Sequence, residues 1–293
     1  MLVNGSIVAL ITPFNKNGSI NFNKLGELIE FHIAKKTDAL LVLGTTGETT
    51  TLSHDEDDSV VKYTIEKANK RIPIYVGAGS NNTQTQVTYC KKYEEMGADA
   101  LLVISPYYNK ANEEGMYLHF KSVADEIKTP LILYNVPGRT GCSIPYSVVK
   151  RLATHPSVAA IKEASGDISY LATIAKLAND NFQIYSGNDD MIVPALSLGG
   201  SGVISVAANI IPEEIHNLVA YYQNGDTKKA LDIQLKYLDF INALFIETNP
   251  IPIKEAMNLI GMDVGGYRLP LTYMNETNRK ALIKEMNVLG SEV

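Results

Sequence analysis

Short apolar runs alternate with longer amphipathic segments along most of the chain. In the segment over residues 21–36, Leu25, Leu28 and Ile29 are spaced to share one face of a helix. Gly97 lies near the end of another such segment, as is typical of a helix C-terminus. The pattern therefore predicts helices between eight strands, at residues 6–14, 39–48, 72–80, 100–108, 130–137, 158–165, 182–189 and 202–209.

The predicted strands are apolar along most of their length, as expected for strands that are buried on both faces. Continuous apolar strands that alternate with helices indicate a parallel sheet covered by helices. Eight such units predict an α/β fold, a (β/α)8 TIM barrel. An open, doubly wound sheet is the alternative, but the GxGxxG turn that often follows its first strand is missing.

The last quarter of the chain has more helical pattern than a barrel needs. It continues after the eighth strand over residues 210–225, from 226 to about 247, over 248–261 and again from about 276. We expect a catalytic barrel over 1–225 and a C-terminal α-helical domain over 226–293. No Gly/Ser-rich linker separates them, so the extension should not move freely.

Composition and charge narrow the class of protein. The chain has 293 residues, of which 45% are hydrophobic and 20% charged, which is ordinary for a globular protein. Its net charge of -6 provides no basic surface for nucleic acid. We expect no signal peptide and no membrane span. Cys90 and Cys142 form no disulfide framework. Together these features predict a cytoplasmic protein with no nucleic-acid or membrane partner.

A lysine continues the sixth predicted strand without a turn residue before it. Strand alternation puts Val158, Ala160 and Lys162 on one face, and the small Ala160 leaves room for a substrate. Inside a barrel, desolvation favours the neutral amine, which is the nucleophile that forms a Schiff base with a carbonyl. The alternative is a lysine that faces outward and pairs with a helix carboxylate.

Other polar residues end neighbouring strands, where the active site of a barrel lies. Tyr134 could transfer protons at the barrel mouth, although a single tyrosine is more often part of the core or rim. Thr45 and Thr46, between two glycines, offer hydroxyl and N–H groups that suit a carboxylate. Arg139 could bind a carboxylate with two hydrogen bonds, although loop arginines are commonly solvated.

Three motifs lie at these strand ends: GTTGE from residue 44, YNVPGRTG from 134 and IKEASGD from 161. With them, essentially the whole chain resembles the dihydrodipicolinate synthase (4-hydroxy-tetrahydrodipicolinate synthase) family, within the N-acetylneuraminate lyase superfamily of class I aldolases. The three motifs together are specific, whereas Lys162 alone is typical of the superfamily. The resemblance implies a lyase that condenses pyruvate with L-aspartate-4-semialdehyde in lysine and diaminopimelate biosynthesis.

The resemblance also implies roles for individual residues. Lys162 would form the pyruvate imine, and Tyr134, Thr45 and Tyr108 would relay protons. Because the family's counterpart of Tyr108 reaches into the neighbouring subunit, a homotetramer built from tight dimers is implied. The residues that would bind substrate are Thr46 for the pyruvate carboxylate, Arg139 for the semialdehyde, and Gly187 and Ile204 in the pocket wall.

No cofactor is expected beyond the covalent imine on Lys162, and no metal, because the five histidines never pair at ligand spacing. Another pyruvate-dependent aldolase, such as N-acetylneuraminate lyase or a 2-keto-3-deoxy sugar acid aldolase, is the nearest alternative. Arg139 distinguishes the synthase from these aldolases, because it suits a small second substrate with a carboxylate. A catalytically inactive, ligand-binding barrel is disfavoured by the lysine, tyrosines and threonines occurring together.

Two local patterns predict ordinary structure. Ser53 and Glu56 form a capping box at a helix start, and residues 198–203 form a tight turn below the eighth strand. Lys254, after Pro252, is expected in an exposed first helical turn.

The resemblance implies a further site, at which L-lysine inhibits some family members. The chain departs from the inhibited type at two positions: Asp57 replaces a second histidine and Thr85 replaces a glutamate. Weak or absent inhibition by L-lysine is therefore expected. The parts of that site that are kept are Thr49, Thr50, His54, Asn81 and Tyr107.

Overall fold

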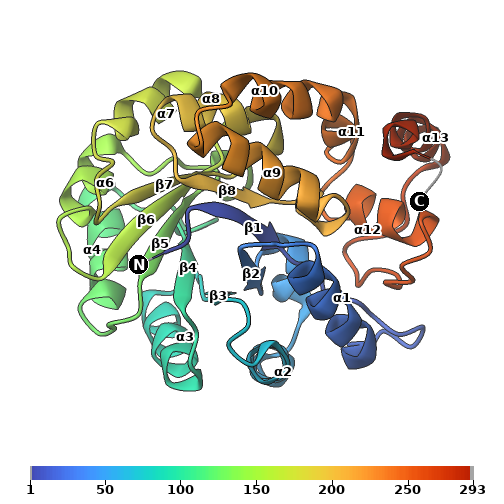
Figure 1. Ribbon diagram of the computed structural model, residues 1–293. Coiled ribbons are helices and arrows are strands. Elements are labelled where there is room, and N and C mark those ends of the chain that lie inside the picture. The colour runs from blue at the N-terminus through green and yellow to red at the C-terminus, as the bar shows by residue number, and fades with distance from the viewer. Residues whose placement is uncertain (1, 291–293) are drawn as a thin grey trace.

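The computed structural model describes residues 2–290, and its eight strands form a closed parallel barrel in chain order (Figure 1). The barrel closes where the first strand pairs with the eighth, with Ile7 opposite Ile204. The predicted α/β barrel is confirmed. The strands are β1 (Gly5–Ala9), β2 (Ala39–Val42), β3 (Ile74–Gly77), β4 (Ala100–Ile104), β5 (Leu131–Asn135), β6 (Val158–Glu163), β7 (Gln183–Ser186) and β8 (Gly202–Ser205).

Helices surround the barrel, and local sequence fixes their ends (Figure 1). The capping box is present, since the Ser53 hydroxyl accepts from the Glu56 N–H and the Glu56 carboxylate accepts from the Ser53 N–H. Gly97 ends its helix with φ 96°, a conformation that favours glycine. The helices are α1 (Phe22–Ala34), α2 (His54–Ala68), α3 (Thr83–Met96), α4 (Glu113–Ala124), α5 (Pro137–Thr140), α6 (Tyr146–Leu152), α7 (Ile168–Ala175), α8 (Ile192–Ser197) and α9 (Pro212–Gln223).

The barrel interior is closed at its amino-terminal end by the first residues of the described chain. The Tyr75 hydroxyl accepts from the Val3 N–H at 3.0 Å, and the Tyr185 hydroxyl donates to the Val3 carbonyl at 2.5 Å. Burial raises the pKa of Tyr75 to about 12, so that phenol stays protonated. Tyr75 and Tyr185 therefore fill the amino-terminal part of the barrel interior, opposite the carboxyl ends of the strands.

In β6, the side chains do not simply alternate between the inside and the outside of the barrel. The register between β5 and β6 shifts, so that Leu131 pairs with Val158 but Ile132 pairs with Ala160. Val158 consequently packs in the layer between strands and helices, whereas Ala160 packs inside the barrel. The prediction that both residues share one face with Lys162 is wrong for Val158, because the irregularity at Ala159 reverses the direction of its side chain.

The C-terminal region packs beside the barrel as α10 (Thr227–Lys236), α11 (Leu238–Ala243), α12 (Ile251–Leu259) and α13 (Glu276–Glu285), with α12 and α13 on one side in Figure 1. The single helical pattern expected to about residue 247 breaks at Tyr237 and ends at Ala243. Gln234 of α10 donates to the carbonyl of Asp189 at 2.9 Å. In the structure, α10 packs directly on the barrel helices α8 and α9. The domain boundary at residue 225 stays a prediction.

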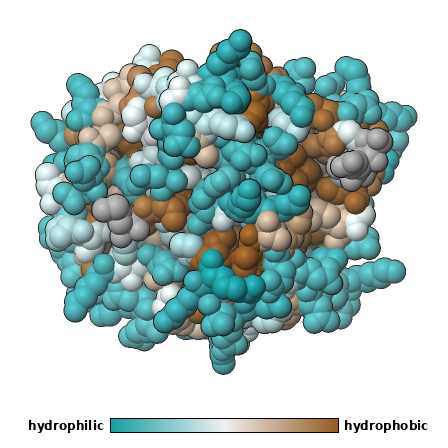
Figure 2. Space-filling model, in the orientation of Figure 1, coloured by the Kyte–Doolittle hydropathy of each residue, from teal (hydrophilic) through white to brown (hydrophobic). Residues whose placement is uncertain are grey.

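Polar side chains cover most of the face drawn in Figure 2, with smaller apolar areas between them. Among residues 2–290, no helix is both long and apolar enough to span a membrane.

Candidate active site

A cavity of about 180 Å³ lies at the carboxyl ends of the strands, where a barrel binds its substrate. A second cavity, of about 280 Å³, adjoins it and shares Thr45, Tyr134 and Arg139. The structure thus brings together six of the eight predicted site residues in the walls of the first cavity: Thr45, Thr46, Tyr134, Arg139, Lys162 and Gly187.

Lys162 of β6 faces this cavity and is 6% exposed. Its Nζ lies 4.4 Å from the centre of the Tyr134 ring. No carboxylate lies within 4.0 Å of that nitrogen in the part of the chain that the structure describes. The adjacent Glu163 accepts instead from the Asn135 side chain at 2.7 Å and from the Ser165 N–H at 2.6 Å. The Lys162 amine is therefore left free to react with a ligand.

Gly187 follows β7 and lies against the stem of Lys162. A Cβ on Gly187 would come 3.0 Å from the Lys162 Cε and 2.5 Å from the Ala164 Cβ, which is closer than packing allows. Its N–H donates to the Glu163 carbonyl at 2.6 Å. Only glycine leaves the lysine stem its observed path at this position.

A buried carboxylate fixes the end of β8 beside the cavity. Asp189 accepts from the Val206 N–H at 2.9 Å and from the Ala207 N–H at 3.0 Å, and Val206 lines the cavity. Burial raises the pKa of Asp189, while the charge of Lys162 acts in the opposite direction. The sequence placed Asp189 at a strand end, but gave no indication that it would bind the backbone after β8.

The turn after β2 presents Thr45 and Thr46 to the cavity. Residues Thr45–Gly47 form a 3₁₀ turn, and the Gly47 carbonyl accepts from the Thr12 hydroxyl at 2.6 Å. Thr46 is buried, and its hydroxyl accepts from the Asn249 side-chain amide at 3.0 Å. With that acceptor position filled, the Thr46 hydroxyl is free to donate to a ligand oxygen.

Asn249, whose role is not apparent from the sequence, connects the two predicted carboxylate-binding residues. Its carbonyl accepts from the Arg139 guanidinium at 3.1 Å, while its side chain binds Thr46. The Asn-Pro pair before α12 signals a turn, but its place in the site depends on contacts between distant segments. Asn249 thereby orients both Thr46 and Arg139.

Lys254 is fully buried, so its predicted exposed position is wrong. Its Nζ lies 2.7 Å from the Glu48 carboxylate, which is also buried. The apolar residues Ile253, Ala256 and Met257 of the same helix are buried as well. Because α12 packs on nearly all of its first two turns, the proline that starts the helix does not place Lys254 in solvent.

Two predicted site residues lie outside the cavity walls. Tyr108 is 93% exposed and has a left-handed φ of 71°, which is uncommon for a bulky residue. Its loop is held by Asn81, whose side chain donates to the Tyr107 carbonyl at 3.1 Å. Ile204 is buried inside the barrel, below the cavity, in the same cluster as Ala160. A role for Tyr108 in a neighbouring subunit stays a prediction.

Four of the seven residues of the predicted L-lysine site line the second cavity: Thr49, Thr50, Asp57 and Tyr107. The other three, His54, Asn81 and Thr85, do not line it. The Thr49 hydroxyl donates to Asp57 at 3.1 Å, and burial raises the pKa of Asp57 to about 6.

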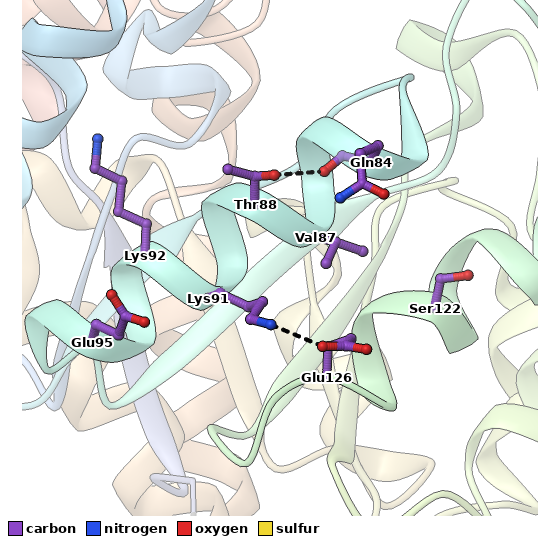
Figure 3. Close-up of a pocket in the computed structure, with 8 residues that line it drawn as sticks. All are labelled: Gln84, Val87, Thr88, Lys91, Lys92, Glu95, Ser122 and Glu126. Atoms are coloured by element: carbon purple, nitrogen blue, oxygen red, sulfur yellow. Dashed lines mark hydrogen bonds and ion pairs between the residues drawn. The ribbon is translucent and has the colours of Figure 1, made fainter.

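A wider groove on the outside of the barrel, between α3 and α4, contains none of the predicted site residues (Figure 3). Its two lysines are paired with carboxylates: Lys91 donates to Glu126 at 2.9 Å, and Lys92 pairs with Asp58 of the neighbouring helix α2. The cavity at the strand ends is the better candidate, because it combines a free amine, a phenol, hydroxyls and a guanidinium. That set suits a carbonyl compound with a carboxylate.

Comparisons with known proteins agree with this geometry. A 4-hydroxy-tetrahydrodipicolinate synthase of Clostridium tetani is 52% identical over 284 residues, covering 97% of this chain and 96% of that protein. The crystal structure of dihydrodipicolinate synthase from Aquifex aeolicus superimposes with a TM-score of 0.94 at 41% identity, covering 97% of both chains. A structure described as a monomeric dihydrodipicolinate synthase variant has a TM-score of 0.95 at 38% identity, covering 98% of this chain and 97% of that one. The profile of the Dihydrodipicolinate synthetase family matches residues 2–288, and the chain belongs to this family.

Proposed function

We propose that this protein catalyses the reaction of 4-hydroxy-tetrahydrodipicolinate synthase, the condensation of pyruvate with L-aspartate-4-semialdehyde. The observation that carries the proposal is the buried Lys162 amine, which pairs with no carboxylate of residues 2–290 and lies 4.4 Å from the centre of the Tyr134 ring. Family membership supports this substrate pair over a sugar acid. The product would enter lysine and diaminopimelate biosynthesis.

The reaction begins when the Lys162 amine attacks the ketone carbon of pyruvate and forms a carbinolamine. Loss of water gives an imine, whose protonated nitrogen draws electrons from the methyl group. Loss of a methyl proton then yields an enamine, which adds to the aldehyde carbon of the second substrate. The amine of that substrate displaces Lys162 from the imine, which releases a cyclic product and regenerates the lysine. No cofactor or metal takes part.

The surrounding residues transfer protons and bind the carboxylates of the two substrates. Tyr134 and Thr45 line the cavity and pass protons during dehydration and enamine formation. Thr46, oriented by Asn249, binds the pyruvate carboxylate. Arg139 receives the carboxylate of the semialdehyde.

Assembly belongs to the same proposal. The exposed Tyr108, at a loop held in a left-handed conformation, would complete the proton relay of a neighbouring subunit in a homotetramer of tight dimers. A monomeric variant has a similar fold, so sedimentation velocity tests the assembly, and a tetramer is the expected result. We place the enzyme in the cytoplasm, together with the biosynthetic reactions that it would serve.

A coupled assay tests the substrate pair. Turnover with pyruvate and L-aspartate-4-semialdehyde, and none with N-acetylneuraminate or a 2-keto-3-deoxy sugar acid, is the expected result. Cleavage of either sugar acid at a higher kcat/KM would favour the other aldolases of the superfamily.

A further inference from the structure

The buried ion pair between Glu48 and Lys254 lies directly behind the turn that carries Thr45 and Thr46. Lys254 is 0% exposed and the Glu48 side chain 1%, and their charged atoms are 2.7 Å apart. The ammonium also lies 4.3 Å from the centre of the Phe14 ring. Burial lowers the pKa of Lys254, and the charge of Glu48 opposes that effect. Neither charge is used in the mechanism above.

Glu48 is itself the residue that ends the catalytic turn. Its N–H donates to the Thr45 carbonyl at 3.1 Å, and its φ of 54° is left-handed, which is uncommon for a residue other than glycine. The second carboxylate oxygen of Glu48 accepts from the Arg268 N–H at 3.3 Å. Such a conformation persists only where the surroundings fix it, and here the two contacts of the carboxylate do so.

Lys254 also contacts the same turn indirectly, through Thr12. Its Nζ donates to the Thr12 carbonyl at 3.1 Å, and the Thr12 hydroxyl donates to the Gly47 carbonyl at 2.6 Å. Lys254 therefore contacts both the residue that ends the turn and the residue that holds its last carbonyl.

Lys254 also lies five residues after Asn249, the residue that contacts Thr46 and Arg139. Its backbone N–H donates to the Pro250 carbonyl at 3.1 Å, at the start of α12. The ion pair thus joins two segments that meet at the cavity: the turn after β2 and the start of α12. Both segments supply the groups that orient Thr46.

We propose that Glu48 and Lys254 are positioning residues, which hold the Thr45–Thr46 turn and Asn249 in the arrangement that receives the substrate carboxylate. The kinetic part of this inference rests on the proposed function. The alternative is that the pair only neutralises two buried charges. Because a buried ion pair can often be replaced by neutral side chains without loss of stability, stability and positioning can be separated.

Two variants and one matched control make the test. Lys254→Met removes one charge of the pair and leaves the Glu48 carboxylate unpaired. The double variant Glu48→Gln with Lys254→Met removes both charges, so that no unpaired charge is buried. Arg279→Met is the control, because Arg279 pairs at 2.7 Å with Glu255, the neighbour of Lys254 on α12, outside the cavity walls. We expect both test variants to lose about 10- to 100-fold in kcat/KM for pyruvate, the effect of displacing a binding group by a fraction of an ångström to an ångström.

Hydrogen exchange over residues 43–52 gives a readout that does not need activity. The amides of Gly47, Glu48 and Thr51 are bonded within this segment, and should exchange faster in both test variants but not in the control. Wild-type kinetics in the double variant, or unchanged exchange over 43–52, would overturn the positioning role. A wild-type enzyme that forms no imine with pyruvate contradicts the proposed function instead, and the exchange comparison still decides whether the pair positions the turn.

Discussion

Gly187 lies so close to Lys162 that a Cβ at position 187 would come 3.0 Å from the Lys162 Cε. The same atom would come 2.5 Å from the Ala164 Cβ and 3.1 Å from the Glu163 carbonyl, so three sides of the position are already occupied. The path of the reactive lysine is therefore set by the absence of a side chain at position 187, directly after the neighbouring strand β7.

Gly187→Ala should lower both stability and the rate of imine formation. The added methyl group must displace β6 or the Lys162 stem, which typically costs about 1–3 kcal/mol of unfolding free energy. Gly138→Ala is the control, since a Cβ there would meet no atom within 4 Å apart from its chain neighbours and its own helix backbone. Denaturant unfolding and single-turnover trapping with pyruvate measure the two effects, and a Gly187→Ala variant with wild-type trapping would refute the proposed constraint.

Arg139→Ala should separate the two substrates. Imine formation with pyruvate should stay largely intact, whereas transition-state stabilisation with the semialdehyde should fall by about 1.5–3 kcal/mol, the range for a hydrogen bond to a charged group. Arg151→Ala, on the outer surface where Arg151 pairs with Glu114, serves as the control. Unchanged kcat/KM for the semialdehyde would exclude Arg139 as its binding residue.

Asp57 should make the protein less stable as pH rises. Its folded pKa of about 6 lies above the ordinary value near 4, because burial disfavours the carboxylate. The folded state therefore binds more protons between pH 4 and 6, and stability falls across that window by roughly 2–3 kcal/mol. Asp57→Asn should remove this loss and be the more stable protein at pH 7, with little difference at pH 4.

Thermal unfolding from pH 4 to 8 measures the effect. Asp55→Asn is the matched control, because Asp55 is an exposed residue in the same first turn of α2. Equal pH slopes for wild type and Asp57→Asn would show that Asp57 titrates normally.

L-lysine should inhibit weakly or not at all, with half-inhibition above about 1 mM. Absence of a glutamate at Thr85 removes a charged partner for the ligand ammonium, a deficit of roughly 1.5–3 kcal/mol, or one to two decades in affinity. Asp57 in the wall of the second cavity restores only part of that charge, because its carboxylate already accepts from Thr49. Thr85→Glu should increase inhibition, and half-inhibition of the wild type below about 1 mM would contradict the prediction.

The sequence predicted the fold well because buried parallel strands are apolar throughout and recur between amphipathic helices. It also indicated the positions of Lys162 and Tyr134, because the ends of strands in a barrel converge. Both residues lie in the cavity wall. The direction of Val158 was not predictable, because it depends on a register shift against β5 rather than on local alternation.

The contacts that join distant segments were also missed. Lys254 follows Pro252 at a helix start, a pattern typical of exposed residues, yet its partner Glu48 lies 206 residues earlier. Asn249 and Asp189 likewise act on backbone or side chains that only the closed barrel brings near. Hydrophobic periodicity reports which face of an element is buried, but it does not identify the partner of a buried polar group.

The central claim is that Lys162 forms an imine with pyruvate, and borohydride trapping tests it most directly. Incubation with pyruvate and borohydride, followed by peptide mass spectrometry, should find one reduced pyruvyl group per chain, on Lys162. Lys162→Ala should fold, take up no label and lose nearly all turnover. Label on another lysine, or an unmodified Lys162 in an enzyme that turns over, would contradict the account.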